Sequence, residues 1–410
     1  MKLISLICAI LVSCTAFTQV PCEECTPLDD YYCQLYPEAC QECFDTCIED
    51  RRDVRRIPGV SRQFGVDYTL QRGVGAFAID YGSDDYGVVE NMVDDGLRIV
   101  NIWTNTVPYC PGHSIEPFPS VEWVVDEPWC EWEQFLRKTR AKQIHVRLHA
   151  WADTEGNEQP DACRINTLEP AGFIVYRLYE MLWWKDLTIV VTPWEQGWYS
   201  LGCWNCPGLE NCCPESGLSE ECSWEQKKYE YLVRQDRLIA QYENLMIDVT
   251  QARKLMLQRY PNAKLNVLFA MTVNKSGGYN VPGEPPRWWW TEGLPTLAER
   301  IGQMKHKPDL VGVSYYVYGV DPAIVLDHIK DLTKFPPKRI FIAEFGGKGS
   351  DDQVRRLNDY VPAFWDWGVR TVIAWAWYFP EGATYDKWLL SDEAIDAINQ
   401  LNFEAITWNR

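Results

Sequence analysis

Two glutamates each follow directly on an apolar segment of the kind that forms a buried strand. Glu195 ends the segment 188–195 (TIVVTPWE), and Glu344 lies near the end of the segment 339–346 (RIFIAEFG). Because a carboxylate is costly to bury, a glutamate at such a strand end is expected to face a polar cavity. Two carboxyl groups at one cavity can share acid–base work: a protonated one donates to a leaving oxygen, while an ionised one attacks or stabilises a carbon. We therefore take Glu195 and Glu344 as candidate catalytic residues.

The neighbours of each glutamate indicate which role it takes. Glu195 follows Trp194 and precedes a second tryptophan three residues on. An apolar setting raises the pKa of a carboxyl group, so Glu195 suits the acid. Glu344 needs hydrogen-bond donors to stay ionised, and Arg147 and Tyr316 are the candidates. A single glutamate at a strand end could equally form a structural ion pair, whereas two at strand ends among tryptophans favour catalysis.

The elements that must position these residues are apolar strands that alternate with amphipathic helices from residue 73 onward. The runs are nearly continuous in apolar residues, which is typical of parallel strands covered on both faces. The expected strands are residues 74–81, 98–103, 143–151, 187–194, 264–273, 309–316, 339–345 and 371–378. The clearest helical patterns are residues 224–260, 295–305, 322–333, 351–367 and 392–401.

Eight strand–helix repeats predict a (β/α)₈ barrel. A doubly wound sheet is the alternative, but it normally has a glycine-rich phosphate turn after its first strand, and residues 79–84 (IDYGSD) are no such turn. In a barrel, strands four and seven are roughly opposite, and their carboxyl ends meet at the face where active sites form. Two carboxylates across such a gap are what hydrolysis of a glycosidic bond needs.

Several strand segments resemble the retaining (β/α)₈ glycoside hydrolases of the clan that includes cellulases, mannanases and galactanases. Residues 341–346 (FIAEFG) are similar to the nucleophile strand of that clan, and residues 309–316 (DLVGVSYY) to its sixth strand. Residues 374–377 (AWAW) resemble the eighth strand, and residues 146–149 (VRLH) the third. The resemblance covers the chain from about residue 73 to its end.

The resemblance implies a retaining double displacement on a β-glycan, with no metal and no organic cofactor. It implies Glu344 as the nucleophile and Glu195 as the acid and base. It also implies that Tyr316 hydrogen-bonds the nucleophile, that Trp377 forms the floor of a sugar subsite, and that His149 lines the cleft.

Two positions depart from the pattern of the clan. The residue before the acid/base is usually an asparagine that binds the sugar 2-hydroxyl, and here it is Trp194. The second strand usually carries an arginine near the nucleophile, and residues 100–103 (VNIW) have none. Arg147 could substitute, since it has the same alternation as His149 and faces the barrel axis if His149 does. A barrel that binds carbohydrate with little or no hydrolysis is therefore an alternative, and a hydrolase whose carboxylates hold a metal is another.

Other strand ends carry further candidates for sugar binding. Asp80 closes the first strand and could bind a sugar hydroxyl or cap the next helix. Trp194 and Trp377 could stack on the apolar face of a sugar, although a single tryptophan more often packs in a core. His149 could equally be a satisfied core histidine.

The N-terminus predicts a secreted protein. Residues 1–18 (MKLISLICAILVSCTAFT) have one lysine, a short apolar run and small residues, which is typical of a signal peptide cleaved after Ala16 or Thr18. The alternative is a bacterial lipobox at residues 11–14 (LVSC), with a lipid anchor on Cys14.

Residues 19–57 form a separate cysteine-rich module that ends in a basic linker, and residues 58–410 form the barrel. Six cysteines in a short segment predict a disulfide-stapled piece in a secreted chain, with a zinc site as the alternative. The linker (RRDVRR) could also be a processing site after Arg56. Eight more cysteines follow strands two, three and four, where disulfides would order long loops. The module contains Cys22, Cys25, Cys33, Cys40, Cys43 and Cys47.

The charge excludes some partners. The chain has 39 Lys and Arg against 58 Asp and Glu, a formal net charge of −19, which argues against binding to nucleic acid or to an anionic membrane surface. After the signal segment, no apolar run is long enough to insert in a membrane. The sequence leaves the oligomeric state open.

Overall fold

The computed structural model describes residues 66–80, 87–104, 131–148, 171–193, 224–275, 277–286, 291–378 and 389–407. The predicted signal peptide, the cysteine-rich module and its linker lie outside these residues, as do all the cysteines. None of the described helices is both long and apolar enough to cross a membrane.

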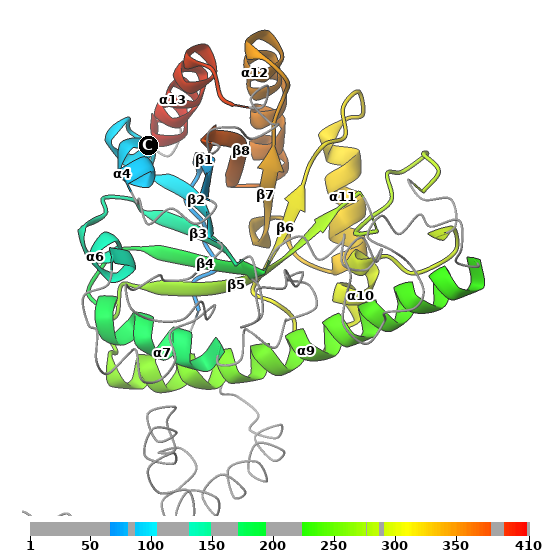
Figure 1. Ribbon diagram of the computed structural model, residues 1–410, viewed down its shortest axis with the longest axis horizontal. Helices are drawn as coiled ribbons and strands as arrows, with labels where there is room; N and C mark the ends of the chain where they lie inside the picture. The colour runs from blue at the N-terminus through cyan, green and yellow to red at the C-terminus, as the bar shows by residue number, and fades with distance from the viewer. Residues whose placement is uncertain are drawn as a thin grey trace, which may run out of the picture.

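Eight parallel strands close into a barrel in the order of the sequence, from β1 to β8 and back to β1 (Figure 1). The predicted (β/α)₈ barrel is confirmed, and each strand lies within a few residues of its expected position. The strands are β1 (Gly73–Asp80), β2 (Ile99–Thr104), β3 (Gln143–Leu148), β4 (Thr188–Pro193), β5 (Asn266–Asn274), β6 (Leu310–Ser314), β7 (Ile340–Phe345) and β8 (Thr371–Tyr378).

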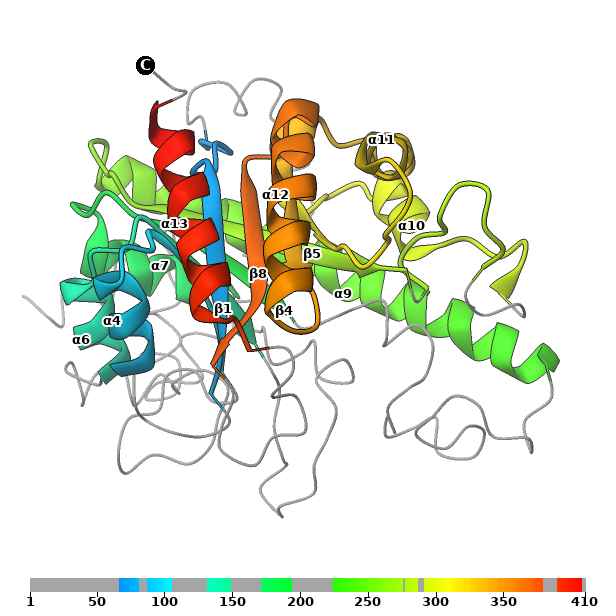
Figure 2. The same cartoon turned by 90° about the horizontal axis from the view of Figure 1, so that it is seen from above.

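Helices pack around the outside of the barrel. The helix α9 has 36 residues, so it is about 54 Å long and extends beyond the barrel in Figure 1. Figure 2 shows α12 and α13 in front of β8 and β1. The described helices are α4 (Gly87–Asp94), α6 (Glu131–Lys138), α7 (Ala171–Leu182), α9 (Trp224–Arg259), α10 (Leu297–Gln303), α11 (Pro322–Thr333), the 3₁₀ helix η8 (Pro337–Arg339), α12 (Ser350–Trp367) and α13 (Asp392–Thr407).

The hydrophobic core has two parts. The larger part joins the outer faces of the strands to the helices. The smaller part lies inside the barrel and takes its residues from the strands and from the segment that precedes β1. On β7 the alternation is clear, because Ile340 and Ile342 belong to the outer part while Phe341 and Ala343 belong to the inner one.

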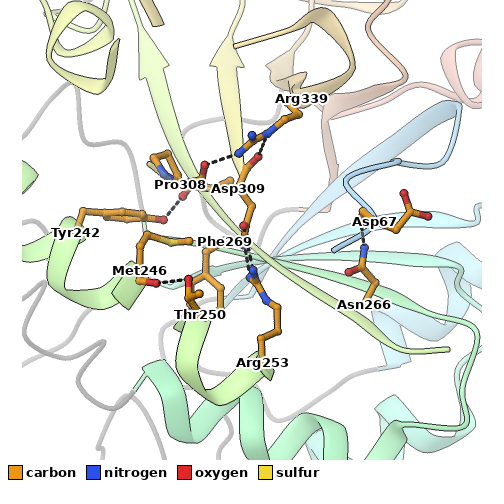
Figure 3. A network of polar contacts seen from close by, with 11 residues as sticks. Asp67, Tyr242, Met246, Thr250, Arg253, Asn266, Phe269, Pro308, Asp309 and Arg339 are labelled. Atoms are coloured by element: carbon orange, nitrogen blue, oxygen red, sulfur yellow. Dashed lines mark hydrogen bonds and ion pairs between the residues drawn. The ribbon is translucent and has the colours of Figure 1, made fainter. Parts of the chain in front are cut away.

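A buried ionic network fixes the amino-terminal end of the barrel (Figure 3). Arg253 on α9 donates to both carboxylate oxygens of Asp309, which also accepts from the backbone N–H of Phe269 at 2.8 Å. Arg339 donates from Nε to the Asp309 carbonyl at 2.6 Å and from Nη2 to the Pro308 carbonyl at 2.8 Å. These contacts join α9, the start of β6 and η8 at the amino-terminal end of the barrel.

The segment before β1 closes the same end of the barrel. Leu70 is buried in the inner part of the core, and Val66 and Tyr68 pack against it. Arg370 donates to the Leu70 carbonyl at 2.7 Å. This segment and the ionic network therefore both lie at the amino-terminal end of the barrel.

Candidate active site

A β-bulge in β7 directs Glu344 into the barrel. Along β6 the partners of Val313 and Ser314 are Ile342 and Glu344, so Ala343 is an extra residue on β7. The pairing with β8 has the same excess, since Ile342 faces Val372 and the next partners are Phe345 and Ala374. Without the bulge, alternation would place Glu344 on the outer face with Ile342. Bulges often redirect a side chain near an active site in this way.

The buried carboxylate of Glu344 is paired with Arg147. Arg147 Nη1 donates to Glu344 Oε1, and Arg147 Nη2 donates to the Ala343 carbonyl at 2.8 Å. The two side chains are only 2% and 5% exposed. The donor comes from β3, four strands from β7, so the pair spans the interior of the barrel. The cation beside Glu344 thus comes from the third strand.

Tyr316 supplies a second donor to the same carboxylate. It follows β6 by two residues, is half-buried, and its hydroxyl lies 3.4 Å from Glu344 Oε2. The backbone also ties the two strands together, since the Tyr315 N–H donates to the Glu344 carbonyl at 2.8 Å. Each oxygen of Glu344 therefore has its own donor, and the carboxylate is held in one orientation.

A cluster that sequence reasoning missed fixes the segment just after Glu344. The Tyr318 hydroxyl donates to the Gly346 carbonyl, and the Arg356 guanidinium lies over the Tyr318 ring, 3.2 Å from its centroid. Asp352 binds Arg356 Nε at 2.7 Å, and this contact chiefly lowers the pKa of Asp352 to about 2. The spacing of Asp352 and Arg356 on one helix is a sequence signal for their ion pair, but the contact with Tyr318 has none.

Gly346 also brings the end of β7 close to β8. A Cβ atom at this position would lie 2.8 Å from the carbonyl oxygen of Trp375, so only glycine allows the approach. The peptide bond between Trp375 and Ala376 is cis.

The other candidates lie at the carboxyl ends of the strands or beyond the described residues. Asp80 closes β1 and Trp377 lies in β8, and for both the structure places the backbone only. His149 directly follows β3, while Trp194 and Glu195 directly follow β4; these three lie outside the described residues. Because the strands are parallel, β1, β3, β4 and β8 all end at the same rim of the barrel.

The described residues offer no cluster of three or more His, Cys, Asp and Glu side chains that could hold a metal ion. The polar contacts of Glu344 in the described part of the chain are to an arginine and a tyrosine. The guanidinium of Arg147 and a metal ion would compete for the negative charge of Glu344. This arrangement therefore suits a carboxylate that binds no metal.

No family model and no curated protein matches this chain. A search of solved structures finds similar chains at low identity. One is a GH26 β-mannanase from Bacteroides ovatus, with 13% identity, a TM-score of 0.36, and coverage of 87% of this chain and 91% of that one. A GH5 xyloglucan-specific endo-β-1,4-glucanase from a metagenomic library has 14% identity, a TM-score of 0.43, and coverage of 81% and 97%. An endo-1,4-β-mannanase from Rhizomucor miehei has 12% identity, a TM-score of 0.39, and coverage of 84% and 96%.

Proposed function

We propose that this protein is a secreted glycoside hydrolase that cleaves the β-glycosidic bonds of a polysaccharide or oligosaccharide with retention of configuration. The observation that carries the proposal is the buried carboxylate of Glu344. It lies at the carboxyl end of a barrel strand, is turned inward by a bulge, and has one donor on each oxygen. Such a carboxylate is fixed in orientation at the end of the barrel where (β/α)₈ enzymes carry their active sites.

The first chemical step forms a covalent intermediate. Glu344 attacks the anomeric carbon, the bond from that carbon to the glycosidic oxygen breaks, and Glu195 gives its proton to the departing oxygen. In the second step, Glu195 takes a proton from water, and the water oxygen displaces Glu344 from the anomeric carbon. Two inversions leave the configuration unchanged and return both carboxyl groups to their starting states.

The contacts of Glu344 assign different work to its two oxygens. Oε1 is held by the charged guanidinium of Arg147, whereas Oε2 has the longer contact with Tyr316. Oε2 is therefore the attacking atom. Oε1 becomes the carbonyl oxygen of the glycosyl ester and stays bound to Arg147.

Sugar binding is assigned to the strand ends around Glu344. Asp80 and His149 offer polar atoms to sugar hydroxyls, while Trp194 and Trp377 offer flat rings to the apolar face of a pyranose. Trp194 stands where the clan that the sequence resembles usually has an asparagine. Another residue must therefore recognise the sugar 2-hydroxyl.

The proposal of secretion rests on the sequence of residues 1–18 and on the 14 cysteines that remain after Cys8 and Cys14 are removed with it. An even number of cysteines suits disulfide formation in an oxidising compartment.

The test is an assay of full-length protein against a panel of β-glycans that includes mannan and xyloglucan. We expect Glu344→Gln and Glu195→Gln each to abolish the release of reducing sugar, while Glu404→Gln on the exposed face of α13 leaves it unchanged. NMR of the first product should show the β anomer. Hydrolysis at the wild-type rate by both variants would contradict the proposal.

Two other outcomes would favour the alternatives. Binding to a glycan in pull-down experiments without release of reducing sugar would favour a carbohydrate-binding barrel. Loss of hydrolysis on addition of a chelator would favour a metal-dependent hydrolase.

A further inference from the structure

Strand β3 presents three polar side chains in succession to the barrel interior: Gln143, His145 and Arg147. All three are buried, and only Arg147 takes part in the proposed chemistry. Residues two apart on a strand share a face, so the three form a column. The column starts beside the segment that closes the amino-terminal end of the barrel and ends at Glu344.

Hydrogen bonds fix the orientation of the Gln143 amide at the base of the column. Its Oε1 accepts from the backbone N–H of Gln71 at 2.8 Å, so this atom is the oxygen. Its Nε2 donates to Thr371 Oγ1 at 3.0 Å. The Thr371 hydroxyl uses its own proton on the Gln71 carbonyl at 2.7 Å, so it can only accept from Gln143.

This arrangement determines where His145 carries its proton. Gln143 Nε2 lies 2.7 Å from His145 Nε2. Because an amide nitrogen only donates, His145 Nε2 must accept, and the ring proton lies on Nδ1. A protonated ring would instead set N–H against N–H and add a second positive charge beside Arg147.

The surroundings of His145 also favour the neutral ring. Burial and, second, the charge of Arg147 lower the pKa of His145 to about 3. Phe341 from β7 packs on the ring, and the register partners of His145 are the uncharged residues Asn101 on β2 and Val190 on β4. Arg147 is therefore the charge that acts on His145 within the described residues.

Two contacts join β3 to β7 at successive levels of the barrel. At the lower level, the His145 ring packs on the Phe341 ring, with centroids 4.9 Å apart and an interplanar angle of 49°. At the upper level, Arg147 binds Glu344. Gly312 on β6 leaves room for the lower contact, because a Cβ atom there would lie 2.9 Å from Phe341 Cζ. The lower contact thus sets the separation of the two strands just beneath the ion pair.

We propose that His145 is a positioning residue, which Gln143 holds in its neutral form and which, through Phe341, sets the distance at which Arg147 reaches Glu344. This inference rests on the proposed function, because the distance from Arg147 to Glu344 matters for catalysis only if Glu344 is the nucleophile.

The first test is NMR of the histidine ring nitrogens in the full chain, with the His145 signals identified by their loss in His145→Gln. We expect a neutral ring protonated on Nδ1 that does not titrate between about pH 5 and pH 8. A ring protonated on Nε2, or one that titrates with an ordinary midpoint, would overturn the proposal.

The second test is the pH dependence of hydrolysis. In His145→Gln we expect kcat to fall about tenfold, with KM within about twofold of wild type and the acidic limb of kcat/KM moved to higher pH. His145→Phe keeps a ring against Phe341 and should recover part of kcat. His328→Gln on α11 is the matched control and should match wild type. A lower Tm with an unchanged kcat and pH profile in His145→Gln would overturn the positioning role.

The two tests separate this inference from the proposed function. A wild-type chain that shows the expected ring proton but hydrolyses no glycan contradicts the proposed function and leaves the state of His145 as inferred. An active enzyme in which His145 titrates normally contradicts the inference alone.

Discussion

Arg147 on β3 binds Glu344 on β7, so one buried ion pair crosses the inside of the barrel between strands four apart. A buried pair of this kind costs desolvation energy unless its charges are well bonded. Here the guanidinium also reaches the Ala343 carbonyl, and the carboxylate also meets Tyr316. The proposed mechanism depends on this ion pair, because the pair fixes the carboxylate that we propose as the nucleophile.

Replacing Arg147 with lysine tests whether the guanidinium must donate to both the Glu344 carboxylate and the Ala343 carbonyl. Lysine keeps the charge but cannot bind the carboxylate and the Ala343 carbonyl in the same fixed geometry. We expect kcat/KM to fall on the order of 10²-fold, with its acidic limb moved to higher pH. The measurement is the pH–rate profile, and Arg140→Lys at an exposed ion pair with Asp94 is the control. An unchanged profile for Arg147→Lys would show that Arg147 has no part in catalysis.

Removal of the Tyr316 hydroxyl should have a smaller effect. The contact with Glu344 is 3.4 Å long in the free protein, and a hydrogen bond to a charged group contributes about 1.5–3 kcal/mol. We therefore expect Tyr316→Phe to lower kcat by roughly 10- to 100-fold with little change in KM. Tyr229→Phe on the exposed face of α9 is the matched control. A loss confined to KM would place Tyr316 in sugar binding instead.

The buried network of Arg253, Asp309 and Arg339 at the amino-terminal end of the barrel should affect stability and not activity. Asp309→Asn removes the charge that Arg253 needs, and breaking a buried pair costs about 3–5 kcal/mol. Urea unfolding should show a loss of this size, while kcat at low temperature stays near that of wild type. Asp186→Asn, at an exposed pair with Lys142, should leave the unfolding midpoint nearly unchanged. Loss of kcat in folded Asp309→Asn would show that the two ends of the barrel are coupled.

The neutral state of His145 predicts a loss of stability in acid. The unfolded chain binds a proton at His145 near pH 6.5, whereas the folded chain does not until about pH 3. The unfolded state therefore holds more protons in this window, and the free energy of unfolding falls as the pH drops, by at most about 1.4 kcal/mol per pH unit. Urea unfolding at several pH values should show a steeper dependence for wild type than for His145→Gln. Equal slopes would contradict the prediction.

Much of the fold could be predicted because each strand is an apolar run with a clear end. The regions that were missed have physical reasons. The helices α4 and α6 have eight residues each, which is too few for a helical period to stand out. The segment of α7 is mostly apolar because it packs against α9 and in the hydrophobic core, so its helical period is hard to see.

The site could be predicted only in part. The position of Glu344 at a strand end was visible, and the alternation of β3 placed Arg147 in the interior. The bulge at Ala343 could not be predicted from the sequence, because it arises from pairing with both neighbouring strands. Simple alternation along β7 would have turned Glu344 outward. The contact of Arg356 with Tyr318 joins α12 to the segment after β6 and leaves no local pattern in the sequence.

The central claim is that Glu344 forms a covalent bond with the substrate. The direct measurement is mass spectrometry of peptides after incubation with an activated 2-deoxy-2-fluoro-β-glycoside of the sugar that the enzyme hydrolyses. The fluorine slows the second step, so the intermediate should accumulate. The account predicts one glycosyl adduct on the peptide that contains Glu344, and none in Glu344→Gln. An active enzyme that forms no adduct and releases the α anomer, or one that carries the adduct on another residue, would contradict it.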